Sequence, residues 1–196
     1  DAEMLRDQAL AISGLLNTKM FGKSVKPPQP KGLWKAIGLG ASNTKKYVVD
    51  KGNDIYRRSL YTFWKRALPH PAMTIFNAPT RESCTASRER TNTPLQALVL
   101  MNETQYFEAS MKLAKLTLKH GGSTTTSRLI YLYEKMLGAK PDATELAVMQ
   151  QFFPEIEASF NSEKVTLAGQ EIPKETAVWS LLANSLMSLD KFKSKE

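Results

Sequence analysis

The sequence predicts an all-α fold, an irregular helical bundle with long, basic loops rich in proline and glycine. Three observations predict it. The long periodic segments place apolar residues at helical spacing, and several of them start at capping residues and stop at glycine or proline. No alternating pair of strands around a tight turn is recognisable. The 196 residues, 42% of them hydrophobic, suffice for one sizeable core. We therefore predict one domain over residues 1–196, with a loop-rich basic part at 17–93 and a helical part at 94–190.

The first predicted element is a helix over residues 2–16, where Leu5, Ala9 and Ile12 share one face. Residues 17–54 lose this periodicity and are rich in lysine, glycine and proline, which is typical of a long solvated loop. Four apolar residues are expected to pin this loop to the core: Val25, Leu33, Trp34 and Ile37.

A second helix is predicted over residues 55–68, with Leu60 and Phe63 on its apolar face. It ends at the first of three prolines, because proline removes a backbone donor and restricts the residue before it. Pro69, Pro71 and Pro79 are expected to prevent regular structure as far as residue 92.

The sharpest helix start is the string Thr93-Pro94-Leu95-Gln96. Thr93 can cap the helix, proline suits the first helical position, and the Gln96 side chain can bond back to the cap. A restart is predicted at Asn102, where Gln105 repeats the capping pattern, and Gly121 with the next glycine ends that helix.

Further helices are predicted along the remaining chain. One ends at Gly138, where a left-handed C-cap is wanted, and the next opens with a capping box of Asp142 and Glu145. Pro154 lies within that helix and is expected to kink it. The last elements are a polar interlude at 161–171 and a helix over 174–189.

The formal net charge of +8 is unevenly distributed. Residues 1–98 hold 16 Lys+Arg against 7 Asp+Glu, whereas residues 99–196 hold 11 against 12. Such an excess attracts polyanions, whether nucleic acid, acidic glycan, anionic lipid or acidic protein, and charge does not choose between them. The longest apolar runs fall far short of the roughly 20 residues of a membrane span, so no span is predicted.

Residue usage argues against the common cofactor and metal sites. The single cysteine, Cys84, excludes an internal disulfide and covalent haem attachment, and we expect it to be a small buried residue. With only two histidines a His-rich metal site is not expected, and none of the usual catalytic or nucleotide-binding motifs is present. We assign no catalytic residue, no metal ligand and no cofactor to this chain. Whether it is an enzyme stays open.

One candidate anion site lies at the start of the helix that follows Thr93. Free backbone amides, the positive end of a helix dipole and two guanidinium groups can receive sulfate, phosphate or carboxylate. The alternative is that the arginines pair with Glu82, Glu89 or a carboxylate of a packed helix while Thr93 only caps. The candidate residues are Arg88, Arg90, Thr91, Asn92 and Thr93.

A second candidate is a polyanion-binding face on the predicted helix 55–68, where basic and aromatic residues interleave. Its alternative is an ordinary solvated helix surface. The candidate residues are Arg57, Arg58, Trp64, Lys65 and Arg66.

Several long strings make the family recognisable. They are MLRDQALAISGLLN, SVKPPQPKGLW, YRRSLYTFWKR, MTIFNAP, RESC, RERTNTPLQALVLMN and WSLLANSLMSLDKF. Together they closely resemble the planctomycete PSD1 domain, a domain of unknown function also called DUF1553, from one end of the chain to the other. The family's usual F-D-A-P is Phe76-Asn77-Ala78-Pro79 here, so a carboxylate is missing and a metal or base role at this position is weakened.

The resemblance implies the C-terminal portion of such a domain in a larger exported protein, periplasmic or secreted, often with an upstream cytochrome c-like domain. Asp1 without an initiator methionine also suggests numbering that begins inside a longer product. Haem is then expected upstream and not in this chain. We favour a non-catalytic scaffold that contacts other parts of the same parent protein. The alternative is a module that binds or processes anionic glycan, sulfated or uronic, and nucleic acid is not an expected partner.

Overall fold

The computed structural model describes residues 1–34, 46–167 and 169–194. Over these residues the chain is mostly helical, with eight α-helices, two short 3-10 helices and one two-stranded sheet. The chain divides into two compact units. Unit 1 consists of Asp1–Ala11 and Leu15–Val99, and unit 2 of Ile12–Gly14 and Leu100–Glu196.

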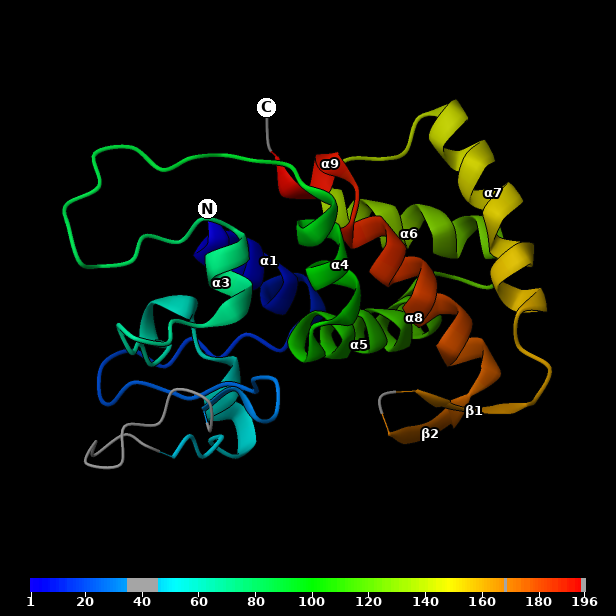
Figure 1. Ribbon diagram of the computed structural model, residues 1–196. Helices are drawn as coiled ribbons and strands as arrows, with labels where there is room; N and C mark the ends of the chain where they lie inside the picture. Colours follow the sequence, from blue (N-terminus) through cyan, green and yellow to red (C-terminus); the bar gives the residue numbers. More distant parts are fainter. Residues whose placement is uncertain (35–45, 168, 195–196) are drawn as a thin grey trace. The chain divides into compact units, whose positions relative to one another are not determined.

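Unit 2 is built around one buried helix. Its elements are α5 (Thr104–His120), α6 (Thr125–Leu137), α7 (Ala143–Ala158), β1 (Lys164–Leu167), β2 (Gln170–Pro173), α8 (Lys174–Met187) and α9 (Asp190–Lys193). Helix α8 contacts α5, α6, α7, α9 and both strands, as can be followed in Figure 1. Its side chains are buried on more than one face, from Ala177 and Trp179 to Ala183 and Met187. The apolar residues of α8 therefore form the centre of this unit.

The helix ends of unit 2 follow local chemistry. The Asp142 and Glu145 capping box of α7 is present as predicted, and Gly138 ends α6 with φ 78°. At α5 the prediction of an Asn102 cap is wrong. The Glu103 side chain takes that place and accepts the amide hydrogens of Gln105 and Tyr106, because a carboxylate one residue further on reaches both.

A hairpin corrects the all-α prediction. Strands β1 and β2 pair antiparallel, and the hairpin covers much of the segment 161–171 expected to be a polar interlude and extends to Pro173. Val165 and Leu167 alternate with polar residues, and Ile172 faces them from β2. These side chains pack with Met111 of α5 and Ala177 of α8, which gives the short hairpin a buried face. Alternation over only four residues is a weak sequence signal.

Among the described residues, unit 1 contains few and short regular elements. They are most of α1 (Ala2–Ser13), the 3-10 helices η1 (Gly52–Tyr56) and η2 (Ser59–Tyr61), α3 (Pro71–Ile75) and the first part of α4 (Pro94–Asn102). Helix α1 stops before residue 16 because Gly14 takes a left-handed φ of 73°. The prolines at 69–79 do not prevent regular structure throughout, since Pro71 occupies the first turn of α3, where no amide hydrogen is needed.

The helix predicted over residues 55–68 is wrong. This segment lies alongside residues 17–25 through two parallel bridges, Asn17 with Arg57 and Val25 with Thr62. The Val25 amide donates to Tyr61 O at 2.8 Å, and the Phe63 amide donates to Val25 O at 2.7 Å. Aromatic and β-branched residues have a low helix propensity and suit extended backbone. The hydrogen bonds to residues 17–25 therefore stabilise this segment more than a local helix would.

The long basic loop is pinned partly as predicted. Val25 and Trp34 are buried and Leu33 is half-buried. Trp34 stacks on Tyr47 with ring centroids 4.9 Å apart and packs against Phe63 at 6.3 Å. The fourth expected anchor, Ile37, lies outside the described residues.

Candidate functional site

The helix start at Pro94 has the predicted capping box. The Gln96 amide donates to Thr93 Oγ1 at 3.3 Å, and the Thr93 amide donates to Gln96 Oε1 at 3.1 Å. The buried Gln96 side chain also donates to Ile75 O and to Thr91 Oγ1. The threonines of this candidate site are thus part of an internal network that ties α4 to α3.

Arg88 pairs with carboxylates of α1. Its guanidinium lies 2.7 Å from Glu3 Oε2 and 3.8 Å from Asp1 Oδ2. Burial alone would raise the pKa of Glu3, but the hydrogen bond and charge of Arg88 outweigh it and hold that pKa below its usual value. This contact is the alternative that the sequence left open, a carboxylate from a packed helix.

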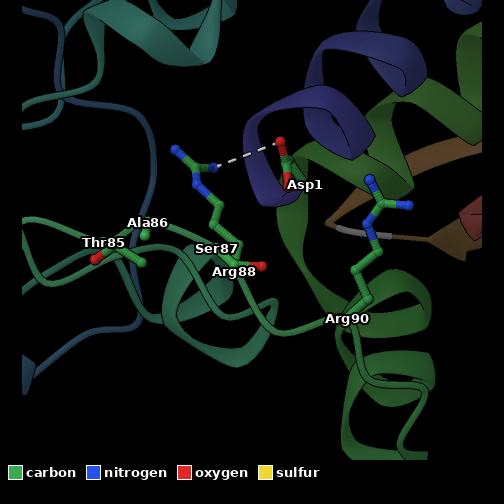
Figure 2. A pocket seen from close by; sticks show the side chains of 6 residues that line it. All are labelled: Asp1, Thr85, Ala86, Ser87, Arg88 and Arg90. Carbon is green, nitrogen blue, oxygen red and sulfur yellow. Dashed lines mark ion pairs between the residues drawn. The ribbon is translucent and has the colours of Figure 1, made fainter.

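An open pocket of about 600 Å³ lies beside this pair and is lined by Asp1, Thr85, Ala86, Ser87, Arg88 and Arg90. In Figure 2 the Arg88 side chain reaches toward Asp1, and the guanidinium group of the exposed Arg90 lies on the other side of Asp1 in this view. The two guanidinium groups do not converge on one point. Anion binding by Arg88, Arg90, Thr91, Asn92 and Thr93 stays a prediction, with Arg90 as its exposed cation.

Asn77 links this loop to the preceding turn. It takes a left-handed φ of 56°, a conformation that asparagine tolerates better than most residues. Its amide nitrogen donates to Thr91 Oγ1 at 2.7 Å. Asn77, at the position where the resemblance implied an aspartate, therefore has a structural contact.

Arg57 is the centre of a second network, in the string YRRSLYTFWKR. It is 3% exposed, although the sequence predicted a solvated position. Its guanidinium donates to the carbonyls of Lys19 at 3.0 Å, Phe21 at 2.6 Å and Lys23 at 2.9 Å. It also lies over the Tyr61 ring, 3.9 Å from the centroid. The segment 19–23 therefore curves around the Arg57 guanidinium, which binds three of its carbonyl oxygens.

Arg6 of α1, which the sequence analysis missed, stabilises the same string from the other side. It is 4% exposed and donates to Arg57 O, Ser59 Oγ and Ile55 O. The neighbouring Asp7 accepts from the Ser59 amide at 2.7 Å. The sequence signal that could have indicated this contact is the adjacent Arg6 and Asp7 on the predicted first helix, because these charges can serve the paired arginines and the backbone of the string YRRSLYTFWKR.

The other residues of the predicted polyanion face are dispersed. Arg58 pairs with Asp7 at 3.3 Å, and Arg66 pairs with Glu82 at 3.1 Å. The Lys65 ammonium lies over the Trp34 ring at 4.8 Å. The half-buried Trp64 carries the Arg81 guanidinium over its ring at 4.6 Å and donates to Thr80 O. No shared helix face presents these groups, and polyanion binding by them stays a prediction.

The cationic excess of unit 1 includes exposed lysines that have no ion pair among the described residues. Most of the carboxylates of this unit are engaged, by Arg88, Arg58 and Arg66 or, for Asp50, by the Lys26 amide at 2.7 Å. The exposed ammonium groups that remain without an ion pair in the described ranges are those of Lys19, Lys23, Lys31, Lys46 and Lys51.

Cys84 and His70 have burial that the sequence did not predict. Cys84 is exposed, so its prediction as a buried residue is wrong; it lies in a loop whose neighbours are also exposed. His70 is 3% exposed. Burial first, and then the positive charge of Arg6, lower its pKa to about 4, with the Pro28 backbone offsetting part of this.

Metal and membrane features were searched over the described ranges only. There, no three His, Cys, Asp or Glu side chains come close enough to hold a metal ion. Among the helices of those ranges, none combines the length and apolar character needed to cross a bilayer.

Comparison with known proteins gives one match. The family model described as PSD1, protein of unknown function (DUF1553), matches residues 1–153. The match includes both arginine-rich strings, whereas the closing segment WSLLANSLMSLDKF, which also suggested the family, lies beyond it. No curated protein and no solved structure matches the chain.

Proposed function

The chain belongs to the PSD1 family of proteins of unknown function (DUF1553), and on this premise we propose that it is a non-catalytic interaction module. It presents exposed lysines of unit 1 to an acidic part of the same parent protein, namely Lys19, Lys23, Lys31, Lys46 and Lys51. That parent is an exported, extracytoplasmic protein with an upstream cytochrome c-like domain. The haem belongs to that neighbour, and this chain needs no cofactor of its own.

One observation carries the proposal. In unit 1 Arg6 and Arg57 are buried and Arg58, Arg66 and Arg88 pair with carboxylates, whereas five exposed lysines have no ion pair within the described part of the chain. Arginine forks are suited to fixed internal contacts, and flexible lysines to a solvated surface that meets a charged partner. The export and the cytochrome c link rest on the family resemblance alone.

The test measures association between this chain and the rest of its parent protein, produced as two polypeptides. We expect binding that weakens as salt rises, because screening reduces attraction between solvent-exposed charges. Changing Lys19, Lys23, Lys31, Lys46 and Lys51 to glutamine should abolish it.

A matched control changes five exposed lysines of unit 2, Lys112, Lys115, Lys119, Lys135 and Lys140, to glutamine. It removes the same net charge and should leave association within about threefold of wild type, since exposed charges that do not meet the partner contribute little. Equal losses in both variants, or no association at all, would overturn the proposal.

A second candidate partner is an anionic glycan. The observation in its favour is the half-buried Trp64 with the Arg81 guanidinium over its ring. An aromatic face can stack on a sugar ring while a neighbouring cation meets its sulfate or carboxylate. Retention on heparin that falls for Trp64→Ala, but not for Trp34→Ala, would support this candidate. Retention equal to that of an unrelated protein of the same charge would exclude it.

A further inference from the structure

The segment 19–23, KMFGK, holds two large apolar side chains outward. Residues 18–24 are all exposed, and Met20 and Phe21 are 63% and 77% exposed. Isolated surface apolar residues need no explanation, but two adjacent ones at the tip of an irregular segment form a compact apolar spot. We call residues 19–23 the KMFGK loop.

The loop is held in a strained conformation. Phe21 has a φ of 62°, which is a true outlier for a bulky residue, and Gly22 follows with 86°. The Phe21 amide donates to Tyr61 Oη at 2.9 Å, and its carbonyl accepts from Arg57. A strained residue persists only where its surroundings over-determine it, and such residues gather at functional positions.

The anchor of the loop is itself costly. Arg57 is buried, and within the described residues its guanidinium meets backbone carbonyls and an aromatic ring but no carboxylate. A buried cation without a counter-ion is expensive even when its hydrogen bonds are satisfied. Backbone strain at Phe21 and the buried charge of Arg57 thus occur at one place in the fold. Together they hold the loop in a conformation in which the Met20 and Phe21 side chains are exposed.

The surroundings of the apolar spot are cationic. Lys19 and Lys23 flank it with ammonium groups that have no ion pair in the described ranges, and their carbonyls are the ones that Arg57 holds. The sequence contains no acidic residue from 8 to 49. The KMFGK loop is therefore an exposed apolar tip within a field of positive charge.

We propose that the KMFGK loop is a contact site for the surface of an anionic bilayer. Met20 and Phe21 enter the boundary between headgroups and acyl chains, while Lys19 and Lys23 lie at the level of the lipid phosphates. This goes beyond the proposed function, since lipid is not part of the parent protein. It is an interfacial contact and needs no helix that spans the bilayer.

A lipid surface fits these observations better than a protein partner. An exposed tip would need a partner with a complementary pocket, whereas a bilayer accepts an apolar tip without one. Both flanking lysines also have a role at a phosphate layer, because each cation near an anionic leaflet adds to the attraction. The hydrogen bonds between the loop backbone and the side chains of Arg57 and Tyr61 lower the entropy lost when Met20 and Phe21 are immobilised.

The test is co-sedimentation of the chain with vesicles of phosphatidylcholine and phosphatidylglycerol in equal parts. We expect binding that weakens with added salt, and no binding to vesicles of phosphatidylcholine alone. The double variant Met20→Ser/Phe21→Ser should lose about tenfold or more in vesicle affinity, because each buried apolar side chain contributes substantially to interfacial binding.

The matched control is Val148→Ser/Phe152→Ser, which removes an exposed aliphatic and an exposed aromatic side chain from α7 of unit 2. It should bind the vesicles as wild type does. A wild-type chain that ignores the anionic vesicles, or a Met20/Phe21 variant that binds them unchanged, overturns the inference. Equal losses in both double variants do the same, because they indicate unspecific apolar adhesion.

A third variant distinguishes the backbone strain at Phe21 from the contact of its ring with the bilayer. Phe21→Gly relieves the left-handed strain and removes the apolar ring, so its thermal midpoint should equal or exceed that of wild type while its vesicle affinity falls. A lower midpoint would contradict the claim of strain. None of these changes should affect association with the parent protein, which distinguishes a failure of this inference from a failure of the proposed function.

Discussion

Units 1 and 2 of this chain are stabilised in different ways. Unit 2 packs apolar helix faces and a hairpin around α8, and its polar groups serve mainly to end helices. Unit 1 has little regular structure, and its segments are joined by the buried guanidinium groups of Arg6 and Arg57, which donate to carbonyls far along the chain. Long irregular segments can be ordered when arginine side chains supply the hydrogen bonds that helices and sheets otherwise supply.

This difference bears on where function can lie. A unit built from directional bonds can hold an exposed loop in a defined shape without a large core beneath it. The KMFGK loop and the five lysines are both in unit 1. Substitutions in each unit, and a change of pH, can break or sharpen the comparison, and their expected effects differ in size.

The largest effect is expected for Trp179→Ala in unit 2. Trp179 is 1% exposed and packs on Phe153 with ring centroids 4.7 Å apart. The cavity left behind should lower the free energy of unfolding of unit 2 by roughly 4 kcal/mol. Hydrogen exchange, read separately for each unit, should show faster exchange in α5 and α8. An equal acceleration in unit 1 would mean that the two units do not open independently.

Arg57→Met tests how much the buried guanidinium of Arg57 stabilises unit 1. Three carbonyls lose their donor, which should lower the free energy of unfolding of unit 1 by about 3 kcal/mol. Exchange should rise first at residues 17–25. The control is Arg58→Met, whose exposed pair with Asp7 should contribute under about 1 kcal/mol. Similar losses for the two variants would show that Arg57 is not the organising residue.

Acid should weaken unit 1 through His70. Its pKa is lowered to about 4 in the folded chain, below the ordinary value of about 6.5, so the unfolded chain binds the proton more readily between these values. Stability is therefore lost as the pH falls from about 6.5 toward 4, by about 2 kcal/mol between pH 7 and pH 5. Urea titrations at both pH values should detect it.

The matched variant for that measurement is His70→Gln, which cannot titrate and should remove most of the pH dependence of unit 1. If the wild type and the glutamine variant lose the same stability on acidification, His70 is not the responsible group.

The smallest expected effect is that of the helix caps. Thr93→Ala in unit 1 and Asp142→Ala in unit 2 each remove a side-chain acceptor from a capping box. Each should lower the free energy of unfolding by about 1 kcal/mol, because the lost bond is local in both units. Thermal unfolding of the two variants checks this. A much larger loss for Thr93 would show that its network with Gln96 and Thr91 does more than cap α4.

The contacts of the candidate anion site could be predicted from the sequence only where both partners are close along the chain. The start of α4 followed from Thr93 and Gln96, because both partners lie within three residues of each other. The partner of Arg88 did not, since Glu3 lies 85 residues earlier. Sequence spacing could name several acids for that arginine but could not choose among them.

The helical character, the C-terminal end of α6, the start of α7, the N-terminal excess of positive charge and the family were determined by the sequence alone, because capping, periodicity and composition act within a few residues. Tertiary structure decided the rest. It placed Arg57 inside a loop 34 to 38 residues away and paired β1 with β2 over a buried face. It also replaced the helix predicted over residues 55–68 by short 3-10 turns and bridges to residues 17–25. Such choices depend on which distant segments meet, and the free energy of those contacts outweighs the local preferences that a sequence reveals.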